Sequence, residues 1–219
     1  GFLMRATLIG ATGLIGSHLL ELLLADEYFD SVRILIRRPM DFTHPKLEKK
    51  LVDFSDMESF RLALEDSDVV FCSIGTTQKK VKGDKDAYRK IDYDITVNAA
   101  RFCKLNGCET FVFVSTVGAN SKSNNFYLKL KGEIEEAVKT VGLTNVYIMQ
   151  PSLLLGKRKE SRFGEKIAQW IMPLLSFVTP AKYKPVKATY VAKAMIRLVK
   201  EKPNDLSIAT YREIKKMNS

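Results

Sequence analysis

A tyrosine and a lysine four residues apart form the pair best suited to proton transfer in this 219-residue chain. Tyr127 and Lys131 lie in a stretch with helical apolar spacing, so their side chains share one face, with Cβ atoms about 5–6 Å apart. A free tyrosine has a pKa of about 10, and an adjacent ammonium lowers that pKa by favouring the phenolate. The pair predicts general acid–base chemistry, although the same spacing is common by chance.

A serine hydroxyl is expected near this pair. Ser115 closes an apolar run at residues 110–115, which predicts a buried strand. Ligands of parallel sheets bind at the carboxyl ends of the strands, where this hydroxyl would orient a substrate carbonyl or alkoxide. Ser115, Tyr127 and Lys131 are therefore the predicted catalytic residues.

Three glycines with GxxGxxG spacing follow the first apolar run, residues 5–9. Gly10 allows a tight turn, Gly13 lets the backbone approach a pyrophosphate, and Gly16 lets the next helix pack closely. Free amides at that helix N-terminus favour phosphate. A Walker A loop would need a lysine after the last glycine, where Ser17 stands, so ATP hydrolysis on this loop is excluded. The loop residues expected to bind a dinucleotide are Gly10, Thr12, Gly13, Leu14, Ile15 and Gly16.

Two arginines at the tip of the second predicted strand indicate which dinucleotide binds. An NAD site carries an acid there for the ribose 2′-OH, whereas this chain has Arg37 and Arg38. A guanidinium holds a 2′-phosphate by paired hydrogen bonds, so NADP is favoured over NAD, with Arg37 the first choice. The alternative is a solvated basic turn. Asp53 and Phe54, after the third strand, are expected to line the adenine.

The elements that must position these residues alternate between strands and helices. Strands are expected at residues 5–9, 32–36, 50–54, 69–73, 110–115 and 145–150, and helices at 17–24, 57–64, 87–105 and 125–141. Strands that are apolar throughout belong to a parallel sheet covered on both faces. The fold class is therefore α/β, a doubly wound parallel sheet, in one domain over residues 1–219. Residues 151–219, with helices expected at 165–177 and 189–200, form a small C-terminal lobe within it.

Composition limits the remaining functions. The chain carries 35 basic and 25 acidic side chains, a net charge of +10, without a nucleic-acid recognition motif. Its apolar runs are shorter than the roughly 18 residues of a membrane span. Three cysteines and two distant histidines argue against a disulfide framework and a metal site. We expect a reduced, cytoplasmic protein without nucleic-acid partners.

In these motifs the chain resembles the short-chain dehydrogenase/reductase superfamily. The segments SIGTT (73–77), SNNFYLKLKG (123–132) and RKESRFGE (158–165) resemble its atypical branch, which contains the human Tat-interactive, metastasis-suppressor-related protein and bacterial relatives. The resemblance implies a Rossmann fold, NADP binding and a Ser-Tyr-Lys set. It implies further cofactor contacts at Ser73, Gly75, Thr76, Lys131, Pro151 and Leu153.

The resulting hypothesis is an oxidoreductase that transfers hydride between NADP and a carbonyl or alcohol substrate. Arg158 and Arg162 are expected over the mouth of the active site, where they would hold a substrate carboxylate or phosphate. One alternative is an NADP-binding sensor that engages a protein partner with little turnover. The other is an epimerase or dehydratase that uses its bound cofactor transiently.

Overall fold

The computed structural model describes residues 3–74, 84–152, 154–155, 181–203 and 205–219. These ranges contain a parallel sheet of seven strands in the order β3-β2-β1-β4-β5-β6-β9. This topology confirms the predicted doubly wound α/β fold. The strand bounds are β1 Arg5–Ile9, β2 Ser31–Ile36, β3 Leu47–Leu51, β4 Val69–Cys72, β5 Thr110–Val114, β6 Asn145–Met149 and β9 Leu206–Ala209.

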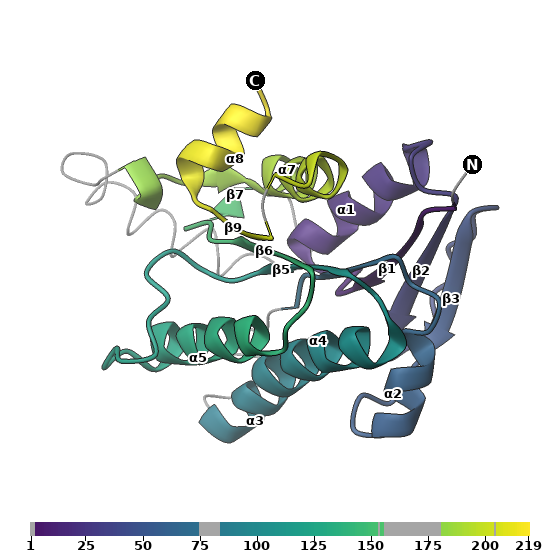
Figure 1. The fold of residues 1–219 in the computed structure, drawn as a ribbon, viewed down its shortest axis with the longest axis horizontal. Coiled ribbons are helices and arrows are strands. Elements are labelled where there is room, and N and C mark those ends of the chain that lie inside the picture. The colour runs from purple at the N-terminus through teal and green to yellow at the C-terminus, as the bar shows by residue number, and fades with distance from the viewer. Residues whose placement is uncertain (1–2, 75–83, 153, 156–180, 204) are drawn as a thin grey trace.

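Helices cover both faces of the sheet, as Figure 1 shows. α1 and α7 lie on one face, and α2, α4 and α5 lie on the other. The short α3 and a π-helical segment precede α4, and α8 ends the chain. The bounds are α1 Leu14–Ala25, α2 Met57–Ala63, α3 Lys85–Arg89, the π-helical segment Lys90–Asp94, α4 Ile95–Asn106, α5 Phe126–Thr140, α7 Ala188–Glu201 and α8 Tyr211–Met217.

The central strands are apolar throughout because each face of the sheet has its own core. In β4, Val69 and Phe71 pack with α1 and α7, whereas Val70 and Cys72 pack against the opposite helices. A strand with one solvated face would alternate apolar and polar residues instead. The two cores fix the sheet between two helical layers and hold its carboxyl edge in place.

Two predicted elements differ in the structure, and one strand of the seven-stranded sheet was not predicted. The third strand was expected at residues 50–54 but is Leu47–Leu51, where Leu47 pairs with Val32 and Leu51 with Ile36. The single helix expected at 87–105 is divided by the π-helical segment. The strand β9 was not expected, because its side chains are largely exposed.

The segment predicted as a C-terminal lobe, residues 151–219, includes β9, which pairs with β6, and α7, which packs on α1. It also contains a second, two-stranded sheet of β7 (Leu154–Leu155) and β8 (Val186–Lys187) and the 3-10 helix η2 (Ala181–Tyr183). The helix expected at residues 165–177 lies outside the described residues.

The sheet has its topological switch point between β1 and β4. These strands are neighbours, yet the chain proceeds from β1 outward to β2 and from β4 outward to β5, so the strand order reverses between them. Ligands of doubly wound sheets bind at this reversal, outside the carboxyl ends of the strands. The glycine loop follows β1 and Ser73 follows β4, so both border this position.

Candidate cofactor and active site

The glycine loop is packed so closely that two of its three glycines admit no side chain. A Cβ on Gly10 would overlap the carbonyl oxygen of Ser73, and Gly10 has a φ of +96°, which L-residues rarely adopt. A Cβ on Gly16 would overlap the Gly10 carbonyl oxygen. The tight turn and the close helix–strand approach predicted for these two glycines are confirmed.

Gly13 is different, because the protein itself leaves room at this position. A Cβ there would lie 3.4 Å from the Gly10 carbonyl oxygen, an ordinary contact, and its φ of −77° suits any residue. Gly13 is the N-cap of α1 and provides no side-chain cap, and the first intrahelical bond is donated by Ser17 to Gly13. The amides of Leu14, Ile15 and Gly16 precede that bond. Uncapped amides at a helix N-terminus fit a pyrophosphate.

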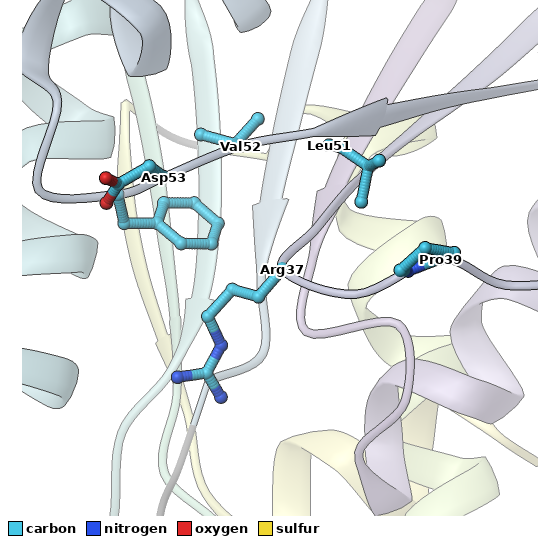
Figure 2. Close-up of a pocket in the computed structure, with 6 residues that line it drawn as sticks. Arg37, Pro39, Leu51, Val52 and Asp53 are labelled. Carbon is cyan, nitrogen blue, oxygen red and sulfur yellow. The ribbon is translucent and has the colours of Figure 1, made fainter.

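Arg37, Asp53 and Phe54, which sequence reasoning assigned to the adenosine, lie together. With Pro39, Leu51 and Val52 they line a cavity of about 440 Å³ between the ends of β2 and β3. Figure 2 shows the guanidinium of Arg37 extending away from Pro39. The Phe54 ring is held by an edge contact with Phe60, with ring centroids 4.8 Å apart.

Charge in this cavity is balanced between a cation and an anion. The Asp53 carboxylate accepts hydrogen bonds from the Ser55 hydroxyl at 2.6 Å and the Ser55 amide at 2.9 Å, which lower the pKa of Asp53. Arg37 is exposed and appears in no ion pair within the described ranges. Arg38, the second choice for a 2′-phosphate, is also exposed but does not line this cavity.

Tyr127 and Lys131 lie together in the first turns of α5. The Lys131 Nζ is 5.6 Å from the centroid of the Tyr127 ring. Tyr88 of α3 packs edge-on against the same ring, with centroids 6.2 Å apart. The predicted juxtaposition of phenol and ammonium on one helix face is confirmed.

Asp92 is a residue of this site that sequence reasoning missed. Its Oδ1 accepts a hydrogen bond from Lys131 Nζ at 3.0 Å, and its Oδ2 lies 2.9 Å from the same nitrogen. Both side chains are buried, with 4% exposed for Lys131 and 1% for Asp92. Asp92 lies in the π-helical segment, and such segments often mark functional sites.

The protonation of this cluster differs from the sequence-based expectation. Burial raises the pKa of Tyr127, and this effect outweighs the lowering by Lys131; Asp92 raises it further. Burial alone would lower the pKa of Lys131, but the Asp92 carboxylate reverses this and raises it above its ordinary range. The phenol is therefore protonated and the ammonium charged at neutral pH.

Ser115 is buried at the end of β5 and its hydroxyl is directed at α5. The Ser115 Oγ donates to Glu135 Oε2 at 2.8 Å, and Gln150 Nε2 donates to Glu135 Oε1 at 2.8 Å. Burial raises the pKa of Glu135 despite these two hydrogen bonds. The hydroxyl of the next residue, Thr116, makes only long hydrogen bonds, to the carbonyls of Val117 at 3.3 Å and Pro151 at 3.4 Å. Thr116 is a second hydroxyl at this edge, which the expected Ser-Tyr-Lys pattern did not include.

The other predicted site residues divide into two groups. Ser73 lies beside the glycine loop, where its amide donates to Ile9 at 2.9 Å, and Pro151 is buried after β6. The remaining five lie outside the described residues and are Gly75, Thr76, Leu153, Arg158 and Arg162.

Comparisons with known proteins identify the family of this chain. The model of the NAD(P)H-binding family matches residues 10–201. Protein FMP52, mitochondrial, of Candida albicans is 34% identical over 207 residues, 88% of this chain and 86% of the relative. Protein HTATIP2 of Rattus norvegicus is 32% identical over 165 residues, 74% and 67% of the two chains.

Solved structures share the fold at low sequence identity. The Bordetella bronchiseptica enzyme WbmH, solved with NAD+, has a TM-score of 0.74 and 20% identity, covering 94% of this chain and 75% of that one. Vestitone reductase from alfalfa has a TM-score of 0.68 and 18% identity, covering 94% and 76%. Epimerases and reductases both occur among these neighbours.

The expected cytoplasmic location is wrong by the same comparisons, because several curated relatives are named as mitochondrial proteins. The helices in the described ranges are all too short or too polar to cross a membrane. The family match and the relatives together show that this chain belongs to the NAD(P)H-binding family, within the atypical short-chain dehydrogenase/reductase superfamily.

Proposed function

We propose that the chain is an NADP-dependent oxidoreductase that reduces a carbonyl substrate, with Tyr127 as the proton donor. The observation that carries the proposal is the Tyr127 ring beside the buried Lys131 ammonium, which Asp92 holds by a hydrogen bond. A general acid must hold its proton at working pH and release it to the oxygen that gains negative charge. Tyr127 meets the first requirement because burial keeps its pKa high.

Each residue of the cluster then has a separate task. Tyr127 Oη donates its proton to the substrate oxygen. The Lys131 ammonium stabilises the phenolate that remains, and it can donate to a cofactor ribose. Asp92 is a positioning residue, since its carboxylate keeps Lys131 charged and fixed. Bound NADPH supplies the hydride to the carbonyl carbon.

The coenzyme fits the chain at two places. The room at Gly13 and the uncapped amides of α1 suit its pyrophosphate. Arg37, exposed in the cavity beyond β2, suits a 2′-phosphate, whereas an NAD site would carry an acid at the same strand tip. These features support NADP over NAD.

We propose that the hydroxyl of Ser115, or that of its neighbour Thr116, contacts the substrate oxygen. The single proton of Ser115 is donated to Glu135, so Ser115 can only accept a hydrogen bond while that arrangement holds. Thr116 makes longer and weaker hydrogen bonds and has its oxygen available. Arg158 and Arg162 are proposed to hold an anionic group of the substrate.

Replacing Tyr127 by Phe tests the proposal. The variant keeps the ring and its contact with Tyr88 but has no proton to donate. We expect turnover of NADPH with a reactive carbonyl to fall about 100-fold or more, the usual range for a positioned acid, while NADPH affinity stays within about twofold. Stopped-flow oxidation of NADPH measures turnover, and titration with NADPH measures its affinity. Turnover equal to that of the unmodified chain would refute the role of Tyr127.

A second candidate function is a cofactor-binding sensor with little turnover. The hydrogen bond from Ser115 to Glu135 favours it, because this hydroxyl is not directed toward a substrate. In that case the unmodified chain binds NADPH but oxidises none with a broad panel of aldehydes and ketones. An epimerase, in contrast, would convert a sugar nucleotide without net consumption of cofactor.

A further inference from the structure

The net positive charge of this chain comes from its C-terminal part. Residues 1–155 contain 20 basic and 20 acidic side chains, whereas residues 181–219 contain 10 basic and 3 acidic side chains. The glycine loop, Arg37 and the Tyr127 cluster all lie in the balanced part. None of the groups proposed to hold the coenzyme phosphates therefore lies within residues 181–219.

Contacts between tyrosine rings and lysines bring the basic residues of this segment together on one surface. Lys184 Nζ lies 5.9 Å and Lys215 Nζ 5.7 Å from the centroid of the Tyr211 ring, so one ring connects the turn after η2 with α8. The Asn218 side chain donates to the Tyr190 carbonyl at 2.9 Å and ties the end of α8 to the start of α7. In Figure 1, α8 lies beside α7, on the side away from α1. We call the exposed lysines of this surface the lysine face; they are Lys182, Lys184, Lys187, Lys215 and Lys216.

Acidic side chains nearby do not neutralise the lysine face. Glu201 pairs with Arg197 at 2.7 Å, and Glu213 accepts hydrogen bonds from Thr210 at the start of α8. Ion pairs between described residues include none of the five lysines. Five like charges close together repel one another, so an anionic partner would relieve that repulsion.

We propose that the lysine face binds the anionic headgroups of a lipid bilayer and holds this chain at a membrane surface. Of the ten basic residues in 181–219, eight are lysines and two are arginines. Lysine is a flexible point charge suited to mobile lipid headgroups, whereas paired recognition of nucleic acid or phosphopeptide favours arginine. Half-buried tyrosines such as Tyr183 and Tyr190 are a side-chain type found at the headgroup level of membranes.

Vesicle sedimentation tests the proposal without any enzyme assay. The full chain is mixed with vesicles of phosphatidylcholine alone, or with vesicles in which a third of the lipid is phosphatidylserine. We expect binding to the anionic vesicles only, and its loss near 1 M salt, where the screening length falls to about 3 Å. In the triple variant K184Q/K187Q/K215Q the partition coefficient should fall about 100-fold, at roughly fivefold for each lysine.

A matched control removes the same charge from the balanced part of the chain. The variant K122Q/K129Q/K139Q replaces three exposed lysines around α5 and should bind the anionic vesicles within about threefold of the unmodified chain. Circular dichroism and NADPH affinity, unchanged in both variants, show that each is folded. Equal losses in the two triple variants would overturn the proposal, because net charge alone would then explain binding. Tighter binding to soluble polyglutamate or duplex DNA than to vesicles of equal charge would also overturn it.

Discussion

The buried pair of Asp92 and Lys131 sets the electrostatics of the site, and neither partner can be removed without leaving an unpaired charge. We expect Asp92→Asn to lower the free energy of unfolding by about 3–5 kcal/mol, and Lys131→Met by a similar amount. The double variant should be less destabilised than the sum of the two, because each single change strands the other charge. Urea unfolding of the four proteins measures this coupling. Strictly additive losses would mean that the pair does not interact.

The raised pKa of Lys131 also determines the pH at which this coupling energy is lost. The folded-state pKa of Lys131 is raised above its ordinary value, so its contribution to stability is complete below about pH 10, the unfolded pKa. That contribution is lost as the pH rises through the folded pKa. The coupling energy should therefore be constant from about pH 6 to pH 9.

Tyr127 gives the pH dependence of the reaction a definite sign. Burial raises the pKa of this phenol above its ordinary value of about 10, so the proton donor persists through the neutral range. We expect kcat/KM for carbonyl reduction to be flat from about pH 6 to pH 9 and to fall only above about pH 10, as the phenol ionises. Initial rates with NADPH across this range measure it. A fall with a midpoint near pH 7 would show that Lys131 outweighs burial.

Among single residues, sequence reasoning found Tyr127 and Lys131 because their spacing is a local property of one helix. Asp92 was missed, because its contact with Lys131 depends on a π-helical turn 39 residues away. The pKa of Tyr127 was expected in the wrong direction for a related reason. Burial is a tertiary property, and it was not weighed against the ammonium.

At the scale of elements, the glycines at the start of α1 differ in role. Gly16 is needed for packing, whereas Gly13 is proposed to serve coenzyme binding. Gly16→Ala would force a Cβ onto the Gly10 carbonyl and should destabilise the fold by several kcal/mol, or abolish folding. Gly13→Ala meets only ordinary contacts, at 3.4 Å and 3.7 Å, so its free energy of unfolding should change by about 1 kcal/mol or less. Its methyl group nevertheless occupies the space proposed for the pyrophosphate, so NADPH affinity should fall at least about tenfold.

Chemical unfolding and cofactor titration of both variants decide the assignment. If Gly13→Ala binds NADPH normally, the pyrophosphate lies elsewhere.

The same scale shows where element prediction succeeds. Buried strands such as β4 and β5 were predicted within a residue or two because both of their faces are apolar. The edge strand β3 contains Glu48, Lys49 and Lys50, so its pairing with β2 rather than its own pattern fixes its bounds. The other edge strand, β9, was missed because Leu206 and Ile208 are about two-fifths exposed and the strand is only four residues long.

For the whole molecule, coenzyme binding and folding are one equilibrium. A ligand that binds only the folded chain stabilises it by about 2.7 kcal/mol at a hundredfold excess over its Kd. For a chain of this size that stabilisation raises Tm by roughly 5–10 °C.

NADPH should therefore raise Tm more than NADH at equal concentration, if Arg37 binds the 2′-phosphate. Arg37→Ala should reduce the NADPH shift to the NADH value and leave the NADH shift unchanged. Arg38→Ala is the matched control, since Arg38 lies outside the cavity and should cost little. Equal shifts for both coenzymes with the unmodified chain would show that the strand tip does not select NADP, and the basic turn would then be a solvated one.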